Sequence, residues 1–98
     1  MAKYGISKKA IDDLDNIWNY TAQTWSIEQA SKYYGDIRNA IIGLCELPAY
    51  SGRNFDWIKP GLMGYRVGHH IVFYNKHKDG SVWGARILHE KMDFERHF

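Results

Sequence analysis

The chain has only one cysteine and no long apolar segment, and these two features exclude several classes of protein. Its 98 residues include one cysteine, Cys45, so no internal disulfide can form and no cysteine pair can hold a metal. Cys45 lies in an apolar helical stretch, where we expect a buried, unreactive thiol. No hydrophobic run approaches the ~18 residues of a membrane span, and residues 1–5 lack the apolar core of a signal peptide. We therefore expect a cytoplasmic protein without a membrane partner.

The motifs of several enzyme classes are also missing. The nine glycines are dispersed and form no phosphate-binding loop, and no Gly-x-Ser-x-Gly sequence marks a hydrolase nucleophile. Five histidines are present, but their spacing does not suit a metal. His69 and His70 are adjacent, so on a strand they would point to opposite faces, and His89 and His97 lie eight positions apart. We expect histidines at the surface and sheet edges, with no metal and no cofactor.

The charges that are present are unevenly spread. Net charge is +2, yet residues 59–98 carry seven Lys/Arg, four Asp/Glu and all five histidines, whereas residues 1–58 carry six Lys/Arg and seven Asp/Glu. The second part is therefore the candidate surface for an acidic partner, with an ordinary solvated face as the alternative. Aromatic residues make up 15% of the chain, more than a small domain hides easily, which indicates that some rings lie at a binding surface.

Two amphipathic helices are predicted in the first half, after a short strand at Tyr4–Ser7. Ser7 is a candidate cap of the first helix, and Ser26 precedes Gln29 at the spacing of a capping box. The absence of a linker predicts an antiparallel helical hairpin. We expect three acidic residues, Asp12, Asp13 and Asp15, to complement the dipole of the first helix. The apolar stripes are Ala10, Ile11, Leu14, Ile17, Trp18, Ala22 and Trp25, then Ala30, Tyr33, Tyr34, Ile37, Ile41, Leu44 and Leu47.

The second half has β character after a loop over residues 48–60. Alternating apolar residues at 63–67, a β-branched and aromatic run at 70–74 and a last run at 82–88 predict three strands, with Asp79-Gly80 in a hairpin turn. Residues 92–98 are expected to form a short helix or turn. The sequence predicts one α+β domain over residues 1–98, in the order β-α-α-β-β-β, with an antiparallel β-sheet packed against an N-terminal α-helical hairpin.

One set of polar residues on these strands could carry function. Arg66, His70, Arg86 and His89 fall on neighbouring strands, which lie about 4.8 Å apart in a sheet, so side chains on one face could converge. Arginine suits phosphate or carboxylate recognition, and histidine can move a proton near neutral pH. The alternative is an ordinary polar sheet face.

Three segments of the chain resemble toxins of the ParE type, within the RelE/ParE superfamily. They cover essentially the whole chain and stand in the right order. They are Leu14-Asp15-Asn16-Ile17-Trp18-Asn19-Tyr20 with Trp25 and residues 30–34, Pro60-Gly61 with Tyr65-Arg66-Val67-Gly68-His69-His70-Ile71-Val72-Phe73-Tyr74, and the ending Arg86-Ile87-Leu88-His89-Glu90-Lys91-Met92-Asp93-Phe94-Glu95-Arg96-His97-Phe98.

The resemblance implies a function and two partners. ParE toxins poison DNA gyrase and are neutralised by a ParD-type antitoxin, whereas RelE-type relatives cut mRNA on the ribosome, and the fold alone does not choose between them. His70 stands where several relatives place a catalytic Arg, and Glu90-Lys91 follow His89 where a Tyr is often found. These departures favour a gyrase inhibitor without catalytic residues. The alternatives are an mRNA endonuclease and a homologue with altered or lost toxicity.

Two surfaces are predicted from these considerations. We expect the segment from His89 to Phe98 to serve toxicity more than folding, the alternative being that its apolar side chains complete the core.

A third functional class, a DNA-binding or structural partner protein, also stays open. Because no helix-turn-helix pattern is present, we expect the protein to contact DNA only through the antitoxin or gyrase. The expected target-binding residues are Arg66, His70, Arg86, His89, Lys91, Arg96 and His97, and the expected antitoxin-binding residues are Tyr33, Tyr50, Phe55 and Trp57.

Overall fold

The computed structural model describes residues 4–46 and 52–98, and its elements follow the predicted order with one addition. The additional strand lies in the segment expected to be a loop. Its two residues are too few to show an alternating pattern, so this strand could not be predicted from hydrophobic periodicity. In chain order the elements are β1 (Tyr4–Ile6), α1 (Lys8–Thr24), α2 (Ile27–Leu44), β2 (Arg53–Asn54), β3 (Met63–Val67), β4 (His70–Lys76), β5 (Val82–His89) and a short 3₁₀ helix, η1 (Phe94–His97).

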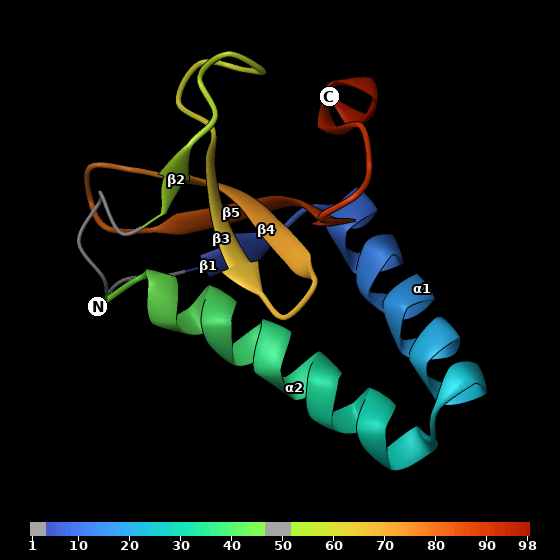
Figure 1. The fold of residues 1–98 in the computed structure, drawn as a ribbon. Coiled ribbons are helices and arrows are strands. Elements are labelled where there is room, and N and C mark those ends of the chain that lie inside the picture. Colours follow the sequence, from blue (N-terminus) through green and yellow to red (C-terminus); the bar gives the residue numbers. More distant parts are fainter. Residues whose placement is uncertain (1–3, 47–51) are drawn as a thin grey trace.

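Both helices begin at the serines that the sequence indicates. The Ser7 hydroxyl accepts a hydrogen bond from the Ala10 N–H at 3.0 Å, and the Ser26 hydroxyl accepts one from the Gln29 N–H at 3.0 Å. The helices are joined directly after Trp25. In Figure 1 they diverge from this junction like the arms of a V, with the sheet between the arms, rather than lying side by side along their length.

The sheet is mixed rather than antiparallel throughout, which corrects the predicted topology. Its strand order is β1-β5-β4-β3-β2, and the pairs β5-β4, β4-β3 and β3-β2 are antiparallel as expected. However, β1 pairs in parallel with β5, with Tyr4 opposite Val82 and Ile6 opposite Gly84. Parallel neighbours need a long connection, and α1, α2, β2, β3 and β4 supply it here.

The core has two parts, one on each face of the sheet. The helix-facing part joins Leu14 of α1 and Ile37 and Ile41 of α2 to side chains such as Val72 and Ile87 of the sheet. On the opposite face, Phe55, Leu62, Phe73 and Leu88 form the second part, and Phe94 packs against it. Because both faces are covered, β4 is buried in its middle and reads as a continuous apolar run rather than an alternating one.

Several local expectations are corrected by the packing. Phe55, predicted to be exposed for antitoxin binding, is only 2% exposed, because it packs edge-on against Phe73 at 5.0 Å between ring centroids. Trp25, predicted to lie on the apolar stripe of α1, is 76% exposed. Cys45 is half-buried rather than buried. No helix within residues 4–46 and 52–98 is long and apolar enough to cross a membrane.

Candidate functional site

The four residues expected to converge lie on opposite faces of the sheet. In the strand register, Arg66 stands opposite Ile71, and Phe73 stands opposite Arg86. His70 stands opposite His89. Because side chains alternate along a strand, the two arginines belong to the face that holds Phe73, and the two histidines belong to the face that the helices cover. The expectation of a single four-residue cluster was therefore wrong.

Arg86 is held by an acidic residue of α1. Its Nε donates to Asp13 Oδ2 at 2.8 Å and its Nη2 donates to Asp13 Oδ1 at 2.9 Å, so the pair is bidentate. The backbone N–H of Ile87 also donates to Asp13, and Arg86 donates to the carbonyl of His97. The hydrogen bonds to Asp13 raise the pKa of Arg86. Asp13 therefore joins α1 to β5, which corrects its predicted role as a complement of the helix dipole; no acidic residue lies in the first turn of α1.

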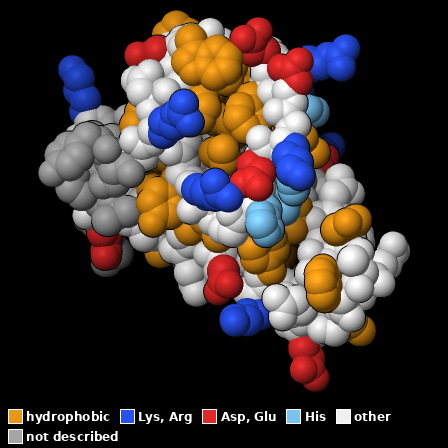
Figure 2. All heavy atoms as spheres, viewed as in Figure 1, with side chains coloured by type: hydrophobic (Ala, Val, Ile, Leu, Met, Phe, Trp, Pro, Cys, Tyr) orange, Lys and Arg blue, Asp and Glu red, His pale blue; other side chains and the backbone are white. Residues whose placement is uncertain are grey.

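Arg66 is exposed, but its charge also has a partner. It forms an ion pair with Glu90, which also meets His69 Nδ1 at 3.3 Å. The hydrogen bond from His69 and the charge of Arg66 lower the pKa of Glu90. Figure 2 shows blue and red side chains interspersed over the visible face, without one continuous basic patch. The excess of basic residues in the C-terminal part therefore does not form a uniformly positive surface on this face.

Tyr33 of α2 fixes the turn between β3 and β4. Its hydroxyl donates to the carbonyl of Val67 at 2.9 Å, accepts from the N–H of His69 at 3.2 Å and meets His70 Nδ1 at 2.7 Å. Gly68 in this turn has φ +58°, and a Cβ there would lie 2.8 Å from the Tyr33 oxygen. Tyr33 is thus a half-buried structural contact, whereas the sequence suggested an exposed antitoxin-binding ring.

The hydrogen bonds of Tyr33 determine the tautomer of His70. Burial raises the pKa of the Tyr33 phenol, so at neutral pH it carries one proton, which it donates to Val67. The phenol oxygen must then accept from His70, so His70 carries its proton on Nδ1 and a lone pair on Nε2. Burial, with the neighbouring His89 and His69, lowers the pKa of His70 to about 4. His70 is therefore a neutral hydrogen-bond acceptor at physiological pH.

Two further histidines gather beside His70. His69 lies in the β3–β4 turn rather than on a strand, and its ring stacks on that of His89 at 6.3 Å between centroids. The His70 ring meets the His89 ring edge-on at 5.2 Å. His69 and His70 thus share one site, although on a strand they would have pointed apart. Within the described part of the chain, no group of three His, Cys, Asp or Glu is arranged to hold a metal ion.

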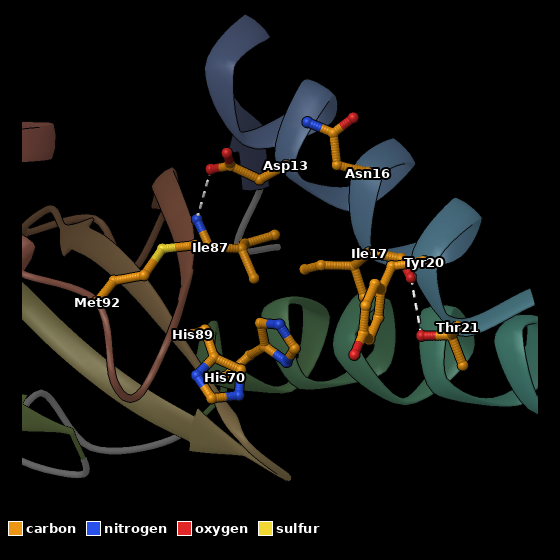
Figure 3. Close-up of a pocket in the computed structure, with 9 residues that line it drawn as sticks. All are labelled: Asp13, Asn16, Ile17, Tyr20, Thr21, His70, Ile87, His89 and Met92. Atoms are coloured by element: carbon orange, nitrogen blue, oxygen red, sulfur yellow. Dashed lines mark hydrogen bonds between the residues drawn. The ribbon is translucent and has the colours of Figure 1, made fainter. Parts of the chain in front are cut away.

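Two adjoining pockets open beside this histidine cluster. One has a volume of about 330 Å³ and lies between α1 and the end of β5, and Figure 3 shows His70 and His89 side by side in it, across from Ile17 and Tyr20 of α1. The other, of about 390 Å³, extends toward Trp25 and Gln29. The two pockets share Tyr20, Thr21, His70 and His89 and form one groove. The remaining lining residues are Asp13, Asn16, Ile17, Ile87 and Met92 in the first pocket and Trp25, Gln29, Tyr33 and His69 in the second.

The other predicted site residues are dispersed. Lys91 and Arg96 are exposed and His97 is half-buried near the C-terminus, while Trp57 is 62% exposed after β2. Tyr50 lies outside the described residues. The C-terminal segment also contributes to the core, because Phe94 packs against Phe73 at 5.0 Å and Phe98 packs against it at 5.2 Å. This finding supports the alternative that the segment completes the fold, at least for its two phenylalanines.

Comparison with known proteins identifies the family. Residues 4–94 match the model of the ParE toxin of the type II toxin–antitoxin system parDE. The chain belongs to the ParE toxin family. It is 33% identical over 95 residues to Toxin ParE1 of Mycobacterium tuberculosis, covering 97% of this chain and 96% of the relative. It is 32% identical over 97 residues to Toxin ParE1 of Caulobacter vibrioides, covering 99% of this chain and 98% of the relative.

The fold of this chain is also similar to that of a solved structure. A chain of the "Chromosomal ParDE TA system from P. aeruginosa" superimposes with a TM-score of 0.73 at 22% identity, covering 91% of this chain and 96% of that one. This ParE-family chain thus has the α+β fold expected from the resemblance. The groove beside α1 was not predicted, because its residues are spread from Asp13 to Met92 along the chain. The available signal was the apolar stripe of α1, whose last residue, Trp25, is exposed instead of buried.

Proposed function

We propose that this ParE-family toxin inhibits DNA gyrase by binding and is neutralised by a ParD-type antitoxin. The family match supports a toxin of a type II toxin–antitoxin system. The related P. aeruginosa chain comes from a ParDE system, which supports a ParD-type partner. On this proposal the protein acts by binding its target and is not itself an enzyme.

The pairing of the strand arginines with carboxylates favours inhibition by binding over RNA cleavage. A nuclease site needs free cations for the phosphate and a group that moves protons. Arg86 is bound bidentately to Asp13, Arg66 is paired with Glu90, and both lie on the face of the sheet opposite His70 and His89. The residues that would imitate a RelE-type cluster are therefore neutralised and separated.

The proposed target contact uses the cations that remain accessible near the C-terminus. Lys91 and Arg96 are the exposed cations of this segment. Exposed cations next to aromatic rings suit a contact with a protein–DNA complex. For the antitoxin, the exposed ring of Trp57 is the proposed contact. Of the other residues predicted for this role, Phe55 is buried and the Tyr33 hydroxyl is hydrogen-bonded to Val67.

The test compares gyrase and ribosomes with the same purified toxin. We expect loss of negative supercoiling by gyrase and accumulation of cleaved DNA, and we expect intact mRNA in a reconstituted translation reaction. Addition of the antitoxin encoded beside the toxin gene should restore supercoiling. Cleavage of ribosome-bound mRNA with gyrase unaffected would overturn the proposal in favour of the endonuclease.

A further inference from the structure

The groove between α1 and the histidine end of the sheet presents two hydrogen-bonding atoms with opposite roles. His70 has its proton on Nδ1, held by Tyr33, so its Nε2 is an acceptor. His89 Nδ1 accepts the backbone N–H of Lys91 at 3.2 Å, so its proton lies on Nε2, which is a donor. Within the described part of the chain, neither Nε2 atom has a hydrogen-bond partner. The ring centroids are 5.2 Å apart and both rings line the same two pockets, so a ring that offers an acceptor and a ring that offers a donor are neighbours there.

The walls of the groove are apolar and aromatic. Ile17, Ile87 and Met92 line the first pocket, and the rings of Tyr20 and Trp25 stand at the second. These two rings are 69% and 76% exposed, and exposed apolar surface gathered at a groove is typical of an interaction site. Flat apolar walls with a few fixed polar atoms are typical of small-molecule sites, and the volume of each pocket is in the usual range of about 300–1,000 Å³.

The charges of the groove exclude several classes of ligand. No lysine or arginine lines either pocket in the part of the chain that the structure describes, and Asp13 is already paired with Arg86. A phosphate or carboxylate would face the lone pair of His70 without a neutralising cation. A purely apolar group would leave both Nε2 atoms without partners. A planar ring with an N–H beside a carbonyl satisfies both atoms and can stack on Tyr20 or Trp25.

We propose that this groove binds an unpaired nucleobase through its N–H and adjacent carbonyl, with the base stacked on Tyr20 or Trp25. The base N–H donates to His70 Nε2, and the carbonyl accepts from His89 Nε2–H. Uracil, thymine and guanine carry this pair of groups on adjacent atoms. The base itself is recognised and the phosphate is not gripped, so binding involves no cleavage of the strand. The site rests on the groove residues and not on gyrase inhibition, for which Lys91 and Arg96 are the proposed contacts.

A titration of the ¹⁵N-labelled full-length protein followed by NMR tests the proposal. Uridine should shift the Trp25 indole and the His70 and His89 ring signals in a saturable way. A ligand control, 3-methyluridine, lacks the N–H and should bind about five- to tenfold more weakly, as expected for one lost hydrogen bond. Uridine and its 5′-monophosphate should bind within about twofold of each other, with little dependence on salt, because the phosphate is not held.

Matched variants separate hydrogen bonding from stacking. His70→Asn keeps an N–H that can reach Tyr33 but removes the Nε2 acceptor, and it should weaken uridine binding about five- to tenfold. His89→Gln keeps a donor close to the position of Nε2 and should bind nearly normally, whereas His89→Ala should not. The double variant Tyr20→Ala/Trp25→Ala should lose about fivefold or more from stacking, while Trp57→Ala and Trp83→Ala, outside the groove, should have no effect.

The source of the base is decided by comparing uridine with a short single strand of DNA or RNA. Tighter binding of the strand, abolished by the Tyr20/Trp25 double variant, identifies a strand as the source, and equal binding identifies a free nucleoside. The proposal is overturned if saturating nucleosides shift no groove signal in the folded wild-type protein. It is also overturned if only phosphorylated ligands bind, with steep salt dependence. Loss of gyrase inhibition alone would affect the proposed function and not this site.

Discussion

Asp13 and Arg86 form a largely buried, bidentate ion pair that links the first helix to the last strand, with side chains only 13% and 16% exposed. The same carboxylate accepts the N–H of Ile87, so one side chain holds both the backbone and a side chain of β5. Removing one member leaves the other charge buried without a partner, which is more costly than exchanging both for apolar residues.

We therefore expect Asp13→Ala to lower the free energy of unfolding by about 3–5 kcal/mol. Urea unfolding followed by circular dichroism measures the change. The neighbouring Asp12→Ala is the control, because Asp12 is exposed and should change stability by less than about 0.5 kcal/mol. The double variant Asp13→Leu/Arg86→Met should recover much of the loss. Equal stability of the Asp13 and Asp12 variants would contradict a structural role for the pair.

Gly68 should tolerate no side chain, because of both its backbone and its neighbour. Its φ of +58° is unfavourable for other residues, and a Cβ would lie 2.8 Å from the Tyr33 oxygen. Gly68→Ala is expected to cost about 1–3 kcal/mol. Gly35→Ala is the matched control: it lies inside α2 with open space around it, so it should stabilise the protein by about 0.5–1 kcal/mol. Thermal denaturation should show a lower melting temperature for Gly68→Ala and a higher one for Gly35→Ala than for the wild-type protein.

The lowered pKa of the half-buried His70 predicts that the stability of the protein depends on pH. Its pKa falls from 6.5 to about 4 on folding, so between these values the unfolded chain binds a proton that the native protein does not. The free energy of unfolding should therefore fall as pH is lowered through this window, by about 1 kcal/mol between pH 7.5 and 5.5 after allowance for solvent screening. His70→Asn removes this contribution. Its stability should change less over the same interval, and parallel profiles for both proteins would refute the assignment.

The C-terminal segment should separate into structural and functional residues. Phe94→Ala removes a ring that packs on Phe55 and Phe73, so it should cost about 1–3 kcal/mol. The exposed Lys91→Ala and Arg96→Ala should each cost less than about 0.5 kcal/mol. On the proposed function they should nevertheless weaken gyrase inhibition, with antitoxin binding unchanged. A Lys91/Arg96/His97 triple alanine variant that remains fully toxic would place the gyrase contact elsewhere.

Local features of the sequence were sufficient for both helices and for every strand except the two-residue β2. Ser7 and Ser26 cap the helices as predicted, because a cap depends on a backbone N–H only three residues away. The strand at 63–67 follows from alternation, the strands at 70–76 and 82–89 from β-branched and aromatic runs, and the Asp79-Gly80 turn from turn chemistry, all of which are equally local. The family, too, could be recognised from ordered segments of the chain, since it depends on residue identity and order.

Features that join distant segments were decided only by the tertiary structure. Asp13 and Arg86 are 73 positions apart, so nothing in the pattern around either residue shows that they pair. The parallel direction of β1, the burial of Phe55 and the gathering of His69, His70 and His89 likewise depend on which elements pack together. The sequence by itself determined the family and every element except β2, because hydrogen bonds and hydrophobic periodicity within a segment are local. The structure alone decided which charges are neutralised and where a groove opens, because long-range packing sets the environment of each side chain.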